Sequence, residues 1–144
     1  MTEYADTSFL WSLYLQDVHS ARATASMGRR TQPLLITSLL EFEFQQAVRL
    51  AIFRGVLTES LGLPALSDFQ RHIADGMLVP TSCNWSVVHA TAGRLSSQYT
   101  RSSGFRGFDL LHVACALTLG ATVMLTFDQP QRRLAAMEGL KCEL

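Results

Sequence analysis

The chain has 144 residues, a formal net charge of zero, 48% hydrophobic residues and 17% charged residues. This composition excludes a disordered chain and indicates one folded domain over residues 1–144. The N-terminal residues lack the basic and apolar segments of a signal peptide, and polar residues interrupt the apolar stretch 110–127. Three cysteines without paired spacing argue against a disulfide framework or a structural zinc site. We therefore expect a cytoplasmic protein with no membrane span.

Short apolar strands alternate with helices along the sequence. The first half predicts a strand ending at residue 6, helices at 8–15 and 17–28, a strand at 34–36 and a helix at 39–54. The second half predicts helices at 66–75, 85–99, 108–119 and 131–138, strands at 77–79 and 122–125, and a short edge strand at 140–144. This alternation indicates an α/β fold, a three-layer sandwich with a mainly parallel central sheet of four to five strands.

Four of the 12 acidic residues lie at the edges of the most apolar segments: Asp6, Glu41, Asp109 and Asp128. Two of them follow predicted strands, and the other two lie in the first turns of predicted helices. Ligands of parallel α/β sheets bind at the carboxyl ends of the strands. We therefore expect the four carboxylates to converge there.

Each of these acids also has a purely structural interpretation. Ser38 and Glu41 match a capping box, and Asp109 is placed to oppose a helix dipole. Asp128 fits a helix N-cap, and Asp6 fits an Asx-type turn. These interpretations explain each residue singly but leave the shared placement unexplained.

Electrostatics favours a cation at a site where such acids meet. Two carboxylates about 6 Å apart repel by roughly 3 kcal/mol at an effective dielectric constant near 20. Bound Mg²⁺ or Mn²⁺ turns this repulsion into coordination by hard oxygen ligands, and such an ion can activate water for attack on a phosphodiester. The sequence contains no glycine-rich phosphate loop and no Ser/His/Asp arrangement that would compete with this hypothesis.

Three neighbours of the acids are candidate supporting residues. Ser8 and Thr126 carry hydroxyls that could position water or a carboxylate. Arg106 precedes Asp109 by three residues and could contact phosphate or clamp a carboxylate.

Two further residues have open roles. His112 follows Asp109 by three residues on the same helical face, so it is either a metal ligand or a core histidine bonded to the backbone. Glu43 is the main rival to Glu41, but it lies on a different face of the same helix.

Arginines are concentrated in two segments without acids, residues 18–40 and 76–108. They are Arg22, Arg29, Arg30, Arg94, Arg101 and Arg106. These segments are compatible with binding to a nucleic-acid backbone, or they are solvated helix faces.

Four segments together resemble the PIN-domain family, and most closely the VapC-like toxin ribonucleases. They are residues 4–10 (YADTSFL), 36–41 (ITSLLE), 106–117 (RGFDLLHVACAL) and 125–128 (LTFD), with smaller matches at 120–121, 135–136 and 139–140. Their order and spacing cover almost the whole chain, so the resemblance implies a single PIN-like domain. Residues 57–98 carry little of the family pattern.

The resemblance implies a metal-dependent endoribonuclease of a type II toxin–antitoxin system. It implies that Asp6, Glu41, Asp109 and Asp128 hold Mg²⁺ or Mn²⁺ and carry catalysis. It also implies an RNA substrate, a homodimer and a cognate antitoxin that blocks the site. The RNA target stays open.

Two other functions compete with this interpretation. The first is a non-catalytic PIN-like module that binds RNA or a partner protein. The second is a phosphoacceptor receiver-like domain, which needs adjacent acids after the first strand and a late lysine. The single lysine, Lys141, lies outside any suitable strand end.

Overall fold

The computed structural model describes residues 2–144. The strands are β1 (Glu3–Ala5), β2 (Leu34–Ile36), β3 (Leu78–Pro80) and β4 (Val123–Leu125). The helices are α1 (Thr7–Tyr14), α2 (Ser20–Gly28), α3 (Ser38–Phe53), α4 (Glu59–Ala74), α5 (Trp85–Leu95), α6 (Arg101–Ser103), α7 (Gly107–Thr118) and α8 (Gln129–Met137), with a π-helical turn η1 (Ser96–Thr100). No helix within residues 2–144 is long and apolar enough to cross a membrane.

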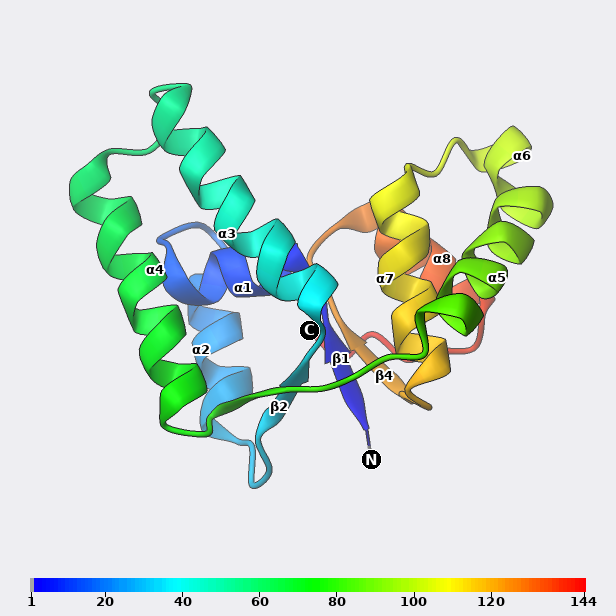
Figure 1. Ribbon diagram of the computed structural model, residues 1–144, viewed down its shortest axis with the longest axis horizontal. Coiled ribbons are helices and arrows are strands. Elements are labelled where there is room, and N and C mark those ends of the chain that lie inside the picture. The colour runs from blue at the N-terminus through cyan, green and yellow to red at the C-terminus, as the bar shows by residue number, and fades with distance from the viewer. Residues whose placement is uncertain (1) are drawn as a thin grey trace.

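The strands are parallel, as predicted, and form two hydrogen-bonded pairs. β1 pairs with β4, and β2 pairs with β3. β1 of one pair lies next to β2 of the other (Figure 1). The predicted edge strand at 140–144 is reduced to one bridge, in which Lys141 pairs with Val123. The α/β class is confirmed, and the described strands are short.

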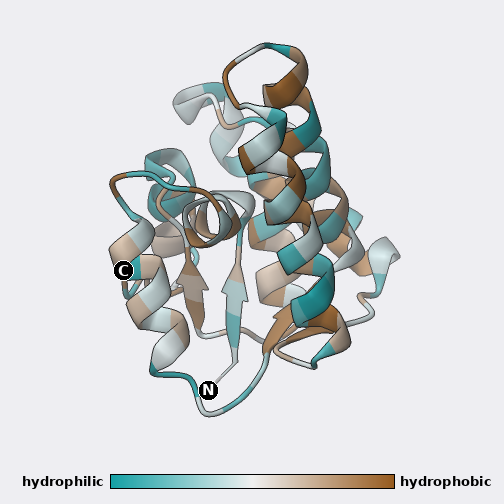
Figure 2. Ribbon diagram, turned by 90° about the vertical axis from the view of Figure 1, so that its left-hand side faces the viewer, coloured by the Kyte–Doolittle hydropathy of each residue, from teal (hydrophilic) through white to brown (hydrophobic). Residues whose placement is uncertain are grey.

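The helices form two groups on either side of the strands (Figure 1). α1 to α4 pack over one hydrophobic cluster, which includes Phe9, Phe44 and Phe69. α5, α7 and α8 pack over a second cluster, which includes Val113 and Met124. Figure 2 shows hydrophobic and hydrophilic positions alternating along the helices, as expected for helices that bury one face.

The predicted helix at 17–28 begins at Ser20 and the one at 131–138 begins at Gln129, and two other helix boundaries differ further from the prediction. α4 begins at Glu59 rather than at residue 66, because the carbonyl of Thr58 already accepts hydrogen bonds from the N–H groups of Leu61 and Gly62 ahead of Pro64. Helical structure after α5 continues through η1 and α6 to Ser103, where the polar sequence predicts a turn. It ends at Gly104, whose φ of 67° suits glycine.

Candidate functional site

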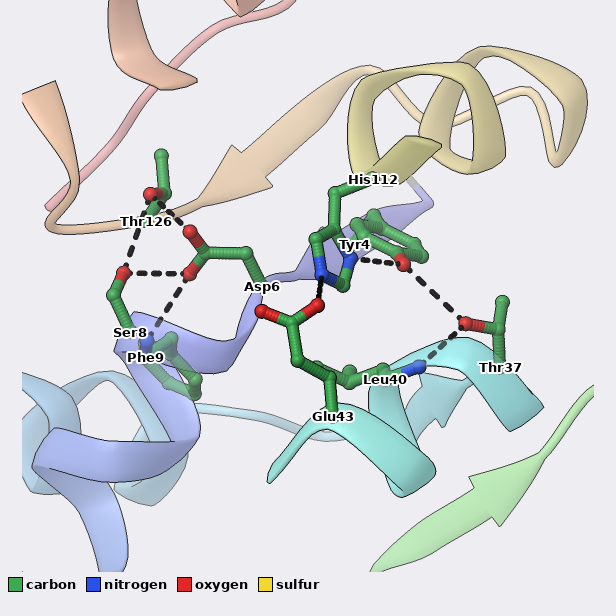
Figure 3. Close-up of polar contacts among 9 residues, drawn as sticks. All are labelled: Tyr4, Asp6, Ser8, Phe9, Thr37, Leu40, Glu43, His112 and Thr126. Carbon is green, nitrogen blue, oxygen red and sulfur yellow. Dashed lines mark hydrogen bonds and ion pairs between the residues drawn. The ribbon is translucent and has the colours of Figure 1, made fainter. Parts of the chain in front are cut away.

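Asp6 lies at the carboxyl end of β1, where it caps α1. Its Oδ1 accepts hydrogen bonds from Ser8 Oγ at 2.6 Å and from the Phe9 backbone N–H at 3.1 Å. Its Oδ2 accepts one from Thr126 Oγ1 at 2.6 Å (Figure 3). The side chain is 1% exposed, and this burial raises the pKa of Asp6, although the hydrogen bonds from Ser8 and Thr126 lower it in part. The hydrogen bonds to Asp6 therefore do not fully offset the cost of burying its negative charge.

Ser8 and Thr126 also connect the ends of β1 and β4. The backbone N–H of Phe127 donates to Ser8 Oγ at 2.9 Å, and that of Asp128 donates to Thr126 Oγ1 at 3.1 Å. Both hydroxyls therefore hold the Asp6 carboxylate and fix the turn that follows β4.

Asp109 lies in the first turn of α7 and Asp128 caps α8, and the two are close enough to influence each other. Asp109 Oδ2 accepts a hydrogen bond from the Arg106 N–H at 3.2 Å, and Asp128 Oδ2 accepts one from the Gln131 N–H at 3.1 Å. Burial raises the pKa of Asp109, and the negative charge of Asp128 raises it further. Capping uses one oxygen of each carboxylate, so the capping and ligand interpretations are compatible.

Arg106 lies at the start of α7 with an exposed side chain. Its positive charge lowers the pKa of Asp109, but burial outweighs this effect. Of the other candidate arginines, Arg94 pairs with Glu138 at 2.9 Å and Arg30 pairs with Glu3.

His112 of α7 is fully buried and contacts side chains of two other elements. Its Nε2 lies 2.6 Å from Glu43 Oε2, and its Nδ1 lies 2.9 Å from the Tyr4 hydroxyl (Figure 3). The Tyr4 hydroxyl in turn lies 3.3 Å from Thr37 Oγ1. His112 is therefore a core histidine, as one interpretation holds, but its partners are side chains and not the backbone.

Glu43 points into the site from α3, whereas Glu41 lies on another face of that helix. Burial raises the pKa of Glu43, but the hydrogen bond and charge of His112 outweigh this, so the pKa is lowered overall. The N-cap of α3 is Thr37, which accepts from the Leu40 N–H, so the capping box predicted at Ser38 is wrong. Glu41 is half-buried, and within residues 2–144 its side chain makes no hydrogen bond or ion pair.

The acids share one electrostatic environment without forming a closed cluster. The charge of His112 lowers the pKa of Asp6, Asp109 and Glu43, which places all three around the same imidazole. Within residues 2–144, no three His, Cys, Asp or Glu side chains are close enough together to hold a metal ion. The chemistry of the donors fits a hard divalent cation, because Asp6 and Asp109 are carboxylates whose ionisation is opposed by burial. The sequence analysis named Asp6 and Asp109 as candidate ligands and considered Glu43 as the rival to Glu41.

The comparisons with known proteins identify the fold. No protein-family model matches the chain, and no curated protein matches it. Solved structures do match. VapC20 of Mycobacterium tuberculosis, a toxin that cleaves the sarcin–ricin loop, is similar with a TM-score of 0.69 at 14% identity, over 94% of this chain and 95% of that one.

Two further solved structures are similar over nearly their whole length. VapBC2 of Rickettsia felis, bound to a DNA fragment from its promoter, gives a TM-score of 0.66 at 15% identity, over 99% of this chain and 98% of that one. FitAcB of Neisseria gonorrhoeae gives a TM-score of 0.65 at 13% identity, over 99% of this chain and 97% of that one. The chain therefore has the PIN-domain fold of the VapC toxins.

Proposed function

We propose that the protein is a divalent-metal-dependent endoribonuclease that hydrolyses RNA phosphodiester bonds. Asp6, Glu43, Asp109 and Asp128 are the residues that would hold Mg²⁺ or Mn²⁺, with Glu43 in the place predicted for Glu41. A bound ion would supply an activated water and offset negative charge on the phosphate.

The observation that carries this proposal is the buried Asp6 carboxylate at the end of β1. Three hydrogen bonds hold it, yet burial still raises its pKa, and no cationic side chain pairs with it within residues 2–144. A carboxylate in this state is stabilised by a cation. Asp109 and Asp128, at the starts of the neighbouring helices α7 and α8, repel each other, so a cation would stabilise them as well.

The chain's own residues orient this acidic site. Ser8 and Thr126 fix both oxygens of Asp6, and His112 fixes Glu43. Such outer hydrogen bonds determine which lone pairs a ligand presents to a metal.

The partners and location follow from the proposed toxin role. We propose a cognate antitoxin that covers the acidic site, because VapBC assemblies are among the similar structures. We also propose a homodimer and a cytoplasmic location; the three free cysteines, Cys83, Cys115 and Cys142, agree with a reducing compartment.

The test is cleavage of RNA by the purified protein. We expect cleavage with Mg²⁺ or Mn²⁺, none with EDTA, and a loss of about two orders of magnitude or more in Asp6→Asn and in Asp109→Asn. Asp75→Asn is the matched control, because Asp75 is exposed at the end of α4. Full cleavage by the Asp6 and Asp109 variants would show that the site assignment is wrong.

A non-catalytic PIN-like module that binds RNA or protein is the second candidate. The described acids do not form a ready group of three metal ligands, which favours it. Titration calorimetry with Mn²⁺ separates the two functions, because the module needs no metal and the nuclease does.

A further inference from the structure

A cavity of 250 Å³ opens beside the acidic site. Its walls include Ser8, Trp11, His19, Phe127 and Asp128. Ser8 is the residue that donates to Asp6, and Asp128 is one of the four candidate ligands. The cavity therefore borders the candidate ligands at Asp128 and is much larger than a single water, which occupies roughly 30 Å³.

One wall of the cavity is a flat aromatic stack fixed to the core. The His19 imidazole lies parallel to the Phe127 ring, with 4.4 Å between centroids and 3° between planes. Phe127 in turn stacks on Phe9 at 6.2 Å and 15°, and Phe9 is fully buried. Because the stack is anchored at Phe9, His19 and Phe127 form a rigid platform at the cavity.

Arg22 contacts both rings of this platform and adds positive charge to it. Its Nη2 lies 2.8 Å from His19 Nδ1, and since a guanidinium only donates, Nδ1 accepts and the imidazole proton is on Nε2. The guanidinium carbon also lies 5.2 Å from the centre of the Phe127 ring. Arg22 itself is exposed, so its charge is open to solvent at the rim.

The second acid in the cavity wall, Asp17, is already occupied by structural contacts. Asp17 accepts hydrogen bonds from Ser12 Oγ at 2.7 Å and from the His19 N–H at 2.8 Å. Its carboxylate therefore holds the start of α2 and the position of His19.

We propose that this cavity is a subsite for one unpaired RNA base, which stacks on the outer face of His19, whose inner face rests on Phe127. Aromatic side chains combined with a neighbouring cation are the usual means of holding single-stranded nucleic acid, because every base has a π-face. Asp128 belongs to both the cavity wall and the acidic site, so a base held here has its adjoining phosphate next to the carboxylates. The proposal rests on the proposed RNA substrate and adds that the substrate is single-stranded at this position.

The test measures binding in EDTA, where cleavage does not occur. A Trp85→Phe background leaves Trp11, in the cavity wall, as the sole tryptophan. We expect adenosine monophosphate to quench Trp11 fluorescence and ribose 5-phosphate, which lacks a base, to leave it unchanged. Anisotropy of a labelled single-stranded RNA oligonucleotide then gives the affinity of each variant.

Four substitutions at three residues probe the platform. His19→Ala and Phe127→Leu are expected to weaken oligonucleotide binding about tenfold, and His19→Phe to restore it. Arg22→Gln is expected to reduce binding and its salt dependence. Phe53→Leu, His89→Ala and Arg54→Gln are the matched controls, since these three residues are exposed and do not line the cavity. Circular dichroism checks that each variant is folded.

The outcomes separate this proposal from the proposed function. If folded His19→Ala and Phe127→Leu bind the oligonucleotide like the parent, or if the parent binds no RNA, the subsite is wrong. If base-dependent binding is present but Mg²⁺ and Mn²⁺ give no cleavage, the subsite stands and the nuclease function is wrong. If cleavage depends on Asp6 while His19→Ala changes neither binding nor cleavage, the nuclease function stands without the subsite.

Discussion

His112 Nε2 lies 2.6 Å from Glu43 Oε2, so one buried imidazole joins α7 to α3 across the two halves of the molecule. Because the Glu43 pKa is lowered, its carboxylate is ionised at neutral pH and accepts the Nε2 proton. His112 Nδ1 lies 2.9 Å from the Tyr4 hydroxyl. This chain of hydrogen bonds fixes Glu43 at the edge of the acidic site and makes it the fourth candidate ligand.

The first prediction compares the two glutamates of α3. Glu43→Gln should reduce metal-dependent cleavage by about two orders of magnitude, because it removes a ligand charge held by His112. Glu41→Gln should leave cleavage within a few-fold of the parent, since its side chain makes no polar contact in the described chain. Initial rates on one RNA substrate measure both. The opposite ranking would restore Glu41 as the ligand.

The second prediction concerns metal binding without RNA. Mn²⁺ at about 100 times its dissociation constant should stabilise the fold by about 2.7 kcal/mol, which raises Tm by roughly 5–10 °C for a chain of this size. Thermal unfolding followed by circular dichroism measures the shift. Asp109→Asn should lose most of it, whereas Asp75→Asn should keep it. An unchanged Tm in the parent at millimolar Mn²⁺ would contradict the metal site.

The third prediction follows from the raised pKa of Asp6. A raised carboxyl pKa means that the folded state holds the proton more tightly than the unfolded state. Its stabilising effect is therefore complete below the unfolded pKa and is lost as the pH rises through the folded pKa. In EDTA, Asp6→Asn should gain stability relative to the parent as the pH rises to 7. Urea unfolding of both proteins at pH 4 and pH 7 tests this. If Asp6→Asn were more stable than the parent by a larger margin at pH 4 than at pH 7, the prediction would be wrong.

The fourth prediction concerns the hydroxyls that hold Asp6. Ser8→Ala and Thr126→Val each remove a hydrogen bond that lowers the pKa of Asp6. The pKa of Asp6 should therefore rise further in both variants. Because the carboxylate must be ionised to bind a cation, the acid limb of the cleavage profile should move to higher pH, with a loss of about 10–100-fold near pH 6. Ser60→Ala, at an exposed serine, serves as control.

The fifth prediction separates packing from catalysis at Tyr4. Tyr4→Phe leaves His112 Nδ1 buried without its hydrogen-bond partner, so it should cost about 1–3 kcal/mol of unfolding free energy. Cleavage should stay within about tenfold of the parent, since Glu43 keeps His112 Nε2. Tyr99→Phe, which removes a partly exposed hydroxyl bonded to Glu138 at 2.9 Å, should cost less. Urea unfolding compares the two variants.

The alternation of strands and helices was predictable because apolar runs and cap residues are local signals. Asp6 and Asp128 were recognisable for the same reason: each lies within three residues of a strand end and caps a helix. The choice between Glu41 and Glu43 was not local. Both flank the buried stripe of α3, on opposite sides, and only packing against α7 decides which side faces the site.

The aromatic platform was not predicted from the sequence either. His19 and Phe127 are 108 positions apart along the printed chain, and neither belongs to a recognisable motif. Their meeting depends on α2 lying beside the turn after β4. Such pairings follow from tertiary topology and not from periodicity or propensity.

The pairing of β1 with β4 also determines when the site can exist. Asp6 and the Thr126 hydroxyl that holds it are 120 positions apart, and β4 is further secured by Lys141. A ribosome must therefore release nearly all of the 144 residues before the acidic site can assemble. Under the proposed function, the growing chain would have no nuclease activity during synthesis, so the proposed antitoxin would have time to meet each molecule as its site assembles.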